Sequence, residues 1–135
     1  MAKYANFRSN LDVLKRAEDQ DLSNEFIQSG IIDKFAMQFE LAWKLLQKTL
    51  AYEGTVEAVV GSPRGIIKAA YGAYDFIDEA IWLEMLTARN ESEHVYDSRM
   101  AERLVNDIIA RYIGTFENLQ ESLENLYGEK LLLTF

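Results

Sequence analysis

Apolar residues recur at steps of three and four along most of this chain, which is the period of an amphipathic helix. The first such segment, about Ala2–Gln20, carries Tyr4, Phe7, Leu11 and Leu14. The second runs from about Asn24 to Glu53 and has the longest apolar stripe: Ile27, Ile31, Phe35, Phe39, Ala42, Trp43, Leu46 and Leu50. A second stripe of Leu41, Leu45 and Tyr52 widens its apolar arc. We therefore expect this helix to be central in a bundle, or shared with another subunit.

Capping residues mark where the other helices begin and end. Ser23 or Asn24 is a suitable N-cap for the second helix, and Gly54 is suited to end it. Residues 55–61 read as a loop whose Val59 and Val60 are expected to pack against the bundle. Ser62-Pro63 then predicts the start of a short helix to about Ala73. Two more helices are predicted over about Phe76–Arg89 and Ser98–Tyr127.

The pattern predicts an all-α protein, because no alternation typical of strands competes with the helical period. We expect one domain over residues 1–135, folded as an up-and-down bundle of four to five helices with short connections. Residues 128–135 form an apolar C-terminal tail, which we expect to pack back on the bundle.

Composition excludes several classes of function. Fourteen basic and twenty-two acidic residues give a net charge of −8, which argues against a basic protein that fills a nucleic-acid groove. RNA could still be held at one locally basic site if Arg64, Lys68, Arg89 and Arg99 gather there. The chain has no apolar run long enough to span a membrane and a polar N-terminus, so we expect a cytoplasmic protein with no membrane partner.

The inventory of reactive side chains is small. With no cysteine and one histidine, thiol chemistry is excluded and a metal site is not expected. The glycines match no nucleotide-binding fingerprint, so we expect no cofactor.

One segment, residues 89–96, stands apart as candidate chemistry. Arg89 falls one and two turns after Met85 and Trp82, on the apolar side of its helix, where a guanidinium needs an anionic partner or a substrate. The only histidine, His94, follows with Tyr96 two residues later. Histidine can act as acid or base, and arginine can hold a phosphoryl oxygen. On residues alone, a purely structural role at the helix junction is the favoured interpretation, because polar residues often cap and bridge such junctions, and the functional one stays open beside it.

Four blocks of sequence resemble one family: FELAWK at 39–44, SPR at 62–64, WLEML at 82–86, and RN at 89–90 with HVYD at 94–97. It is the nucleotidyltransferase substrate-binding protein family, a branch of the HEPN superfamily. The resemblance extends from the first helix to about Leu126. The spacing Arg-X4-His is the superfamily signature, and the following X-Tyr is typical of the nucleotidyltransferase-associated branch.

The resemblance implies a homodimeric helical bundle encoded beside a minimal nucleotidyltransferase. The two proteins resemble the helical domain and the catalytic domain of kanamycin nucleotidyltransferase, split into separate chains. Members of this branch act as toxins that cleave RNA without metal, and their partner neutralises them by transferring AMP to the tyrosine. Carried over residue by residue, Arg89 and His94 are the catalytic pair, Asn90 is the polar residue after the arginine, and Tyr96 is the site of adenylylation.

Three hypotheses follow. Because each chain has one histidine, a dimer that faces two Arg89/His94 pairs could supply both proton-transfer groups that RNA cleavage needs. The alternative is a non-catalytic subunit that positions a substrate for, or docks, the nucleotidyltransferase. The third is a dimerisation module with no site.

Overall fold

The computed structural model describes residues 2–55 and 61–135, and these residues contain no strand. The helical elements, in chain order, are α1 (Lys3–Leu14), a 3₁₀ turn (Ala17–Asp19), α2 (Glu25–Tyr52), α3 (Pro63–Ala73), α4 (Glu79–Glu91), a 3₁₀ turn (Ser92–His94), α5 (Ser98–Asp107), a π-helical turn (Ile108–Tyr112), α6 (Ile113–Tyr127) and α7 (Glu129–Leu132). The predicted all-α class is confirmed.

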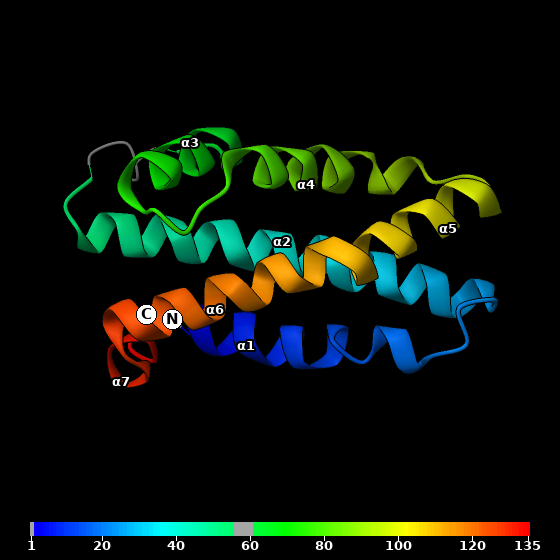
Figure 1. Cartoon of the computed structure of the whole chain (residues 1–135), viewed down its shortest axis with the longest axis horizontal. Coiled ribbons are helices and arrows are strands. Elements are labelled where there is room, and N and C mark those ends of the chain that lie inside the picture. The colour runs from blue at the N-terminus through cyan, green and yellow to red at the C-terminus, as the bar shows by residue number, and fades with distance from the viewer. Residues whose placement is uncertain (1, 56–60) are drawn as a thin grey trace.

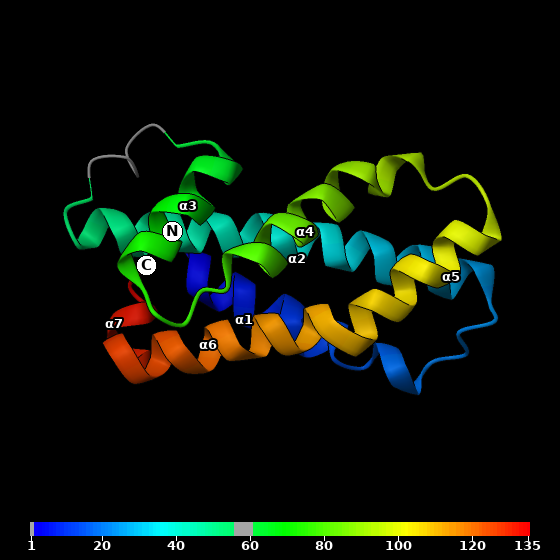
Figure 2. The ribbon, with the colours of Figure 1, turned by 45° about the horizontal axis from the view of Figure 1, so that its top comes forward.

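The helices form an up-and-down bundle (Figures 1 and 2). α1 and α2 run in opposite directions, and α3 and α4 follow one another along α2. The segment of α5 and α6 then runs back along the bundle. α2 contacts α1, α3, α4 and α5. This confirms the central position that the wide apolar arc of α2 predicted.

The helix boundaries of α2 and α3 follow from local capping chemistry. The Asn24 side chain accepts the backbone N–H groups of Phe26 and Ile27 at the start of α2. Gly54, at φ +82°, ends α2 in a Schellman motif, in which its own N–H donates to the Ala51 carbonyl and the next N–H donates to the Leu50 carbonyl. Ser62 caps α3 through the N–H of Gly65, with Pro63 in the first turn as predicted.

Aromatic rings from α4, the π-helical turn and α6 meet those of α2 along its inner face. Phe35 stacks on Tyr112, with ring centroids 5.2 Å apart, and Phe39 lies 6.2 Å from Trp82. Trp82 also meets Phe116 edge to face. All five rings are buried, which agrees with the place of Trp82 on the apolar side of its helix.

Two helix boundaries and one internal turn differ from the expectations. The first α-helix ends at Leu14 and continues only as a 3₁₀ turn. The fourth starts at Glu79, because the side chain of Asp78 accepts the N–H of Ala80 and caps it there. The last predicted helix is continuous from Ser98 but contains the π-helical turn. The expected packing of Val59 and Val60 lies outside the described residues.

The C-terminal tail packs back on the bundle, as expected. Residues 129–132 form α7, and the side chains of Leu132 and Phe135 are buried. The backbone N–H of Lys3 donates to the carbonyl of Phe135 at 3.3 Å, so the first and last helices meet (Figure 1). Across the described ranges, no helix combines the length and the apolar character that crossing a bilayer requires.

Candidate functional site

The residues of the Arg-X4-His-X-Tyr segment occupy a corner between two helices. Arg89 and Asn90 lie in the last turn of α4, His94 lies in the 3₁₀ turn that follows, and Tyr96 lies in the short connection to α5. The connection ends at Asp97, whose side chain accepts the N–H of Met100 at 2.8 Å and so caps α5. Helix termination and capping therefore fix the backbone on both sides of His94 and Tyr96.

Arg89 finds its anionic partner in α2. Its guanidinium forms an ion pair and hydrogen bond with the carboxylate of Glu40, 49 residues earlier in the chain. The same guanidinium donates to the side-chain oxygen of Asn90 at 3.1 Å. The carboxylate of Glu40 also lies 3.7 Å from the ammonium of Lys44, one turn further along α2. The predicted need for an anion at Arg89 is thus met within the chain.

His94 and Tyr96 form a second pair. Nδ1 of His94 lies 2.8 Å from the hydroxyl oxygen of Tyr96, within hydrogen-bond distance. His94 is exposed and the Tyr96 ring is 81% exposed, so both groups are open to solvent. Among the described residues, Arg89 contacts Asn90 and Glu40, and His94 contacts Tyr96. No hydrogen bond among them joins Arg89 to His94 or to Tyr96.

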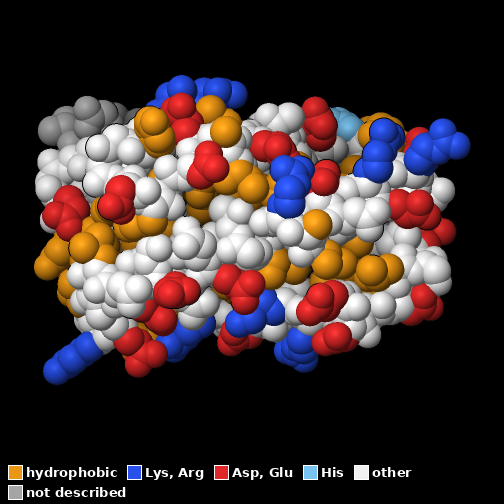
Figure 3. Space-filling model, in the orientation of Figure 1, with side chains coloured by type: hydrophobic (Ala, Val, Ile, Leu, Met, Phe, Trp, Pro, Cys, Tyr) orange, Lys and Arg blue, Asp and Glu red, His pale blue; other side chains and the backbone are white. Residues whose placement is uncertain are grey.

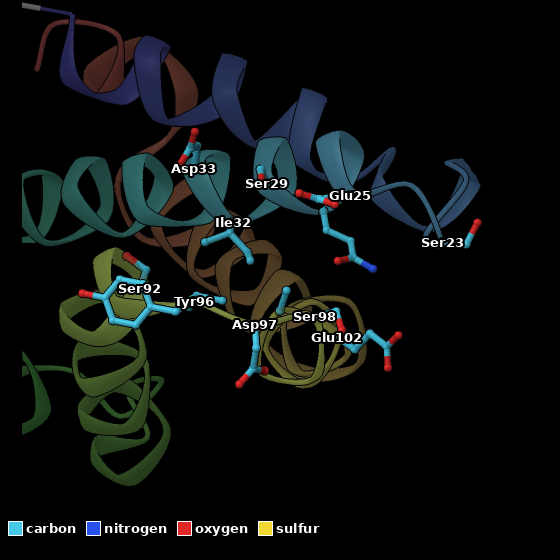
Figure 4. A pocket seen from close by; sticks show the side chains of 13 residues that line it. Ser23, Glu25, Ser29, Ile32, Asp33, Ser92, Tyr96, Asp97, Ser98 and Glu102 are labelled. Atoms are coloured by element: carbon cyan, nitrogen blue, oxygen red, sulfur yellow. The ribbon is translucent and has the colours of Figure 1, made fainter.

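A groove of about 470 Å³ lies beside this corner, between the N-terminal half of α2 and residues 92–102. Ser29, Ile32 and Asp33 contribute to the α2 wall, and Figure 4 shows Ile32 extending from α2 toward the segment that carries Tyr96 and Asp97. Four of its lining residues are acidic, namely Glu25, Asp33, Asp97 and Glu102, and none is lysine or arginine. The groove therefore has a negative potential, which opposes the entry of a phosphate.

The basic residues that RNA binding would need are dispersed. Lys68 on α3 is paired with Glu79 on α4 at 3.4 Å, and Arg89 is paired with Glu40. Arg64 belongs to α3 and Arg99 to α5, at opposite ends of the bundle in Figure 1. Acidic and basic side chains are interspersed on the face that Figure 3 shows. These four basic residues therefore do not gather into one patch in the part of the chain that the structure describes.

A polar network on α4 and the π-helical turn was not singled out by the sequence. The carboxylate of Glu84 accepts hydrogen bonds from Arg111 and from the hydroxyl of Tyr112, the latter at 2.6 Å. Arg111 also donates to Asp107 at 3.1 Å. These donors, Arg111 first, hold the pKa of Glu84 below its ordinary value, while burial and then Glu84 raise the pKa of Tyr112. This network lies beside a second groove of about 410 Å³ between α4 and α5.

No metal centre accompanies these grooves in the part of the chain that is described. The His, Asp and Glu side chains there include no group of three or more that could hold an ion.

The sequence of residues 2–125, which includes all four residues of the corner, matches the profile of nucleotidyltransferase substrate-binding protein-like proteins. The chain belongs to this family. Among curated proteins, no match was found. The family name implies partnership with a nucleotidyltransferase, and the match includes all of α1 to α5 and most of α6. The corner between α4 and α5 holds the one histidine of the sequence, His94.

Proposed function

We propose that this protein is a HEPN-type homodimeric partner of a minimal nucleotidyltransferase, that it cleaves RNA without a metal ion, and that adenylylation of Tyr96 neutralises it. The observation that carries the proposal is the 2.8 Å contact between Nδ1 of His94 and the hydroxyl oxygen of Tyr96. It links the candidate acid–base group to the candidate modification site in a single exposed pair.

The exposure of Tyr96 suits transfer of AMP by a second protein. The phenolic oxygen attacks the α-phosphorus of ATP, a new O–P bond forms, pyrophosphate leaves, and the phenolic proton passes to solvent or to His94. The product carries a phosphodiester on the oxygen that now contacts His94. Its negative charge beside His94 would repel an RNA phosphate, and its bulk would block the corner.

RNA cleavage requires proton transfer at two oxygens. The ribose 2′-hydroxyl loses a proton and attacks the adjacent phosphorus, the bond to the 5′ oxygen breaks, and that oxygen gains a proton. A 2′,3′-cyclic phosphate results. His94 is the side chain suited to this task, and two copies in a dimer would supply base and acid together. Arg89 would stabilise the charge of the phosphorane after it exchanges Glu40 for a phosphate oxygen.

A second candidate function rests on the charge of the 470 Å³ groove. Its four carboxylates and its lack of basic lining residues suit a neutral or cationic molecule better than a polyanion. On this alternative the protein is a non-catalytic subunit that holds a substrate for the nucleotidyltransferase, and Arg89 with Glu40 braces α4 against α2.

RNA cleavage in the presence of a chelator separates the two functions. Wild type freed of AMP, with its mass verified, should cleave, and His94→Ala should not; because His94 is exposed, this change should leave the fold intact. Glu93→Ala, an exposed position in the same 3₁₀ turn, is the matched control and should cleave like wild type. Equal cleavage by wild type and His94→Ala would refute the nuclease. No cleavage by the unmodified protein, together with transfer to a third molecule only when both proteins are present, would support the substrate-binding subunit.

A further inference from the structure

A third groove, of about 320 Å³, lies between the end of α1 and the first half of α2, and we call it the α1–α2 groove. Its lining includes the apolar side chains of Val13, Phe26, Ile27 and Ile31. Val13 is 40% exposed and Phe26 is 85% exposed, so part of this apolar lining faces the surroundings. Exposed apolar side chains that gather in one hollow are typical of a binding surface.

The charge of the α1–α2 groove is opposite to that of the chain as a whole. Arg16 and Lys34 line it, and its described lining residues include no aspartate or glutamate. Neither cation belongs to an ion pair among the described residues. On a chain with net charge −8, such a groove attracts carboxylates to one place while most of the surface repels them. The groove therefore suits a ligand that combines apolar side chains with carboxylates.

The α1–α2 groove and the acidic 470 Å³ groove flank the same turns of α2. Gly30 and Lys34 line the first, and their neighbours in sequence, Ser29 and Asp33, line the second. The second groove is also lined by Tyr96, whose ring is exposed. The starts of α2 and α5 lie at the same end of the bundle (Figures 1 and 2). A protein seated in the α1–α2 groove could therefore reach Tyr96 across the width of one helix, about 10 Å.

We propose that the α1–α2 groove is the docking site of the nucleotidyltransferase, which places an acidic amphipathic helix there while its active site acts on Tyr96. The inference rests on the proposed function, because it names the surface by which the modifying enzyme holds this chain. Apolar side chains at every third and fourth position of that helix contact the walls at Ile27 and Ile31. Carboxylates beside this apolar stripe pair with Arg16 and Lys34.

Other occupants fit the α1–α2 groove less well. An RNA strand gains affinity with each phosphate that is neutralised, and Arg16 and Lys34 are the only cations among the described lining residues. Phe26 is the one aromatic ring there, which is a short platform for stacked bases. A second copy of this chain would bring a further net charge of −8 and the same two cations. The apolar walls and the cations together therefore favour an acidic helix.

Direct binding tests the docking site without reference to AMP transfer. The purified nucleotidyltransferase should bind immobilised wild type, and Phe26→Ser and Lys34→Glu should each raise the Kd by about tenfold or more. Leu126→Ser and Lys130→Glu are the matched controls, because they make comparable changes at exposed positions at the other end of the bundle (Figure 1). Both controls should bind like wild type, and circular dichroism should show unchanged helix content in all four variants.

The kinetics of AMP transfer give a second measurement. Phe26→Ser should raise the KM of the nucleotidyltransferase for this chain and leave kcat near the wild-type value, because the change weakens docking and keeps the acceptor oxygen of Tyr96. Added salt should weaken the binding of wild type more than that of Lys34→Glu, because the variant has lost one of the charge pairs. The Tyr96→Phe protein should bind like wild type and accept no AMP.

Three outcomes would overturn the docking site. The first is a wild type that does not bind the nucleotidyltransferase, and the second is binding by Phe26→Ser and Lys34→Glu that is as tight as that of wild type. The third is a loss in these variants of single-stranded RNA binding or of self-association, while binding of the nucleotidyltransferase is unchanged. Tight binding without transfer of AMP to Tyr96 would instead refute adenylylation and support the docking site, so failure of the inference and failure of the proposed function are distinguishable.

Discussion

Arg89, in the last turn of α4, and Glu40, in the middle of α2, form an ion pair that joins these two helices. Both side chains are largely covered, so each depends on the other for its charge to be compensated. The pair fixes the end of α4, and with it the position of the 3₁₀ turn that carries His94.

The first prediction concerns this pair. Glu40→Gln should lower the free energy of unfolding by about 1 kcal/mol, because it leaves the guanidinium of Arg89 without a compensating charge. Urea denaturation measures the loss. Glu93→Gln, at an exposed position, is the control and should change stability by less than about 0.5 kcal/mol. Equal stability of the Glu40→Gln and Glu93→Gln proteins would show that the pair is not stabilising.

The second prediction concerns Tyr96. Tyr96→Phe removes the oxygen that would accept AMP and keeps the ring. Incubation with the partner nucleotidyltransferase and ATP should increase the mass of wild type by one AMP and leave the Tyr96→Phe protein unchanged. Tyr71→Phe, another exposed tyrosine, should be modified like wild type. Modification of the Tyr96→Phe protein would place the acceptor elsewhere.

The third prediction concerns a polar contact inside the core. The amide of Asn10 donates to Oε1 of Gln38 at 2.7 Å, and the amide of Gln38 donates to the carbonyl of Phe7 at 3.1 Å. Gln38→Ala should lower the free energy of unfolding by about 2–4 kcal/mol, because it opens a cavity and leaves the Asn10 amide short of a partner. Gln20→Ala, on the surface, should cost less than about 0.5 kcal/mol in the same denaturation experiment.

The fourth prediction concerns acid stability. Hydrogen bonds from Arg111, and then Tyr112, lower the pKa of Glu84 in the folded protein below 4.5. A carboxyl whose pKa is depressed stabilises the fold above its unfolded pKa, and this contribution disappears as the pH falls through the folded pKa. In Glu84→Gln, the unfolding free energy should therefore fall less steeply below pH 4.5 than in wild type. Glu121→Gln, an exposed substitution on α6, should retain the wild-type slope.

The fifth prediction concerns alkaline stability. Burial, followed by its hydrogen bond to Glu124, raises the pKa of Tyr4 from 10.0 to about 12. A group with a raised pKa stabilises the fold fully below its unfolded pKa, and this contribution is lost as the pH rises through the folded pKa. Between pH 10 and about 12, wild type should lose stability more steeply than Tyr4→Phe. Parallel unfolding curves of the two proteins across this range would contradict the prediction.

The helices and the core could be predicted because they depend on local sequence. The three-and-four spacing of Tyr4, Phe7 and Leu11 is a property of one segment, and these three side chains are buried as the spacing implies. The caps at Asn24 and Ser62 are equally local. The sequence therefore predicted the buried face of α1 and the residues at which α2 and α3 begin.

The contacts at the candidate site could not be predicted in the same way. That Arg89 needs an anion follows from its position on an apolar face, but the choice of Glu40 depends on how α4 crosses α2. The acidic lining of the 470 Å³ groove combines residues from α2 and α5 that are about seventy positions apart, so no local pattern indicates it. The π-helical turn is similarly hidden, because its buried side chains Ile108 and Tyr112 fit an ordinary helical spacing.

That π-helical turn has a consequence for how the chain tolerates length changes. A π turn holds one more residue than the α turn it replaces, so the helices on either side keep their relative rotation when that residue is absent. Deletion of the exposed Ala110 would convert residues 108–112 to a regular helix and leave Phe116 and Leu119 facing the core. Deletion of one residue inside α6 would rotate everything after it by about 100°. Natural variation in the length of this long helix is therefore expected to concentrate at one turn.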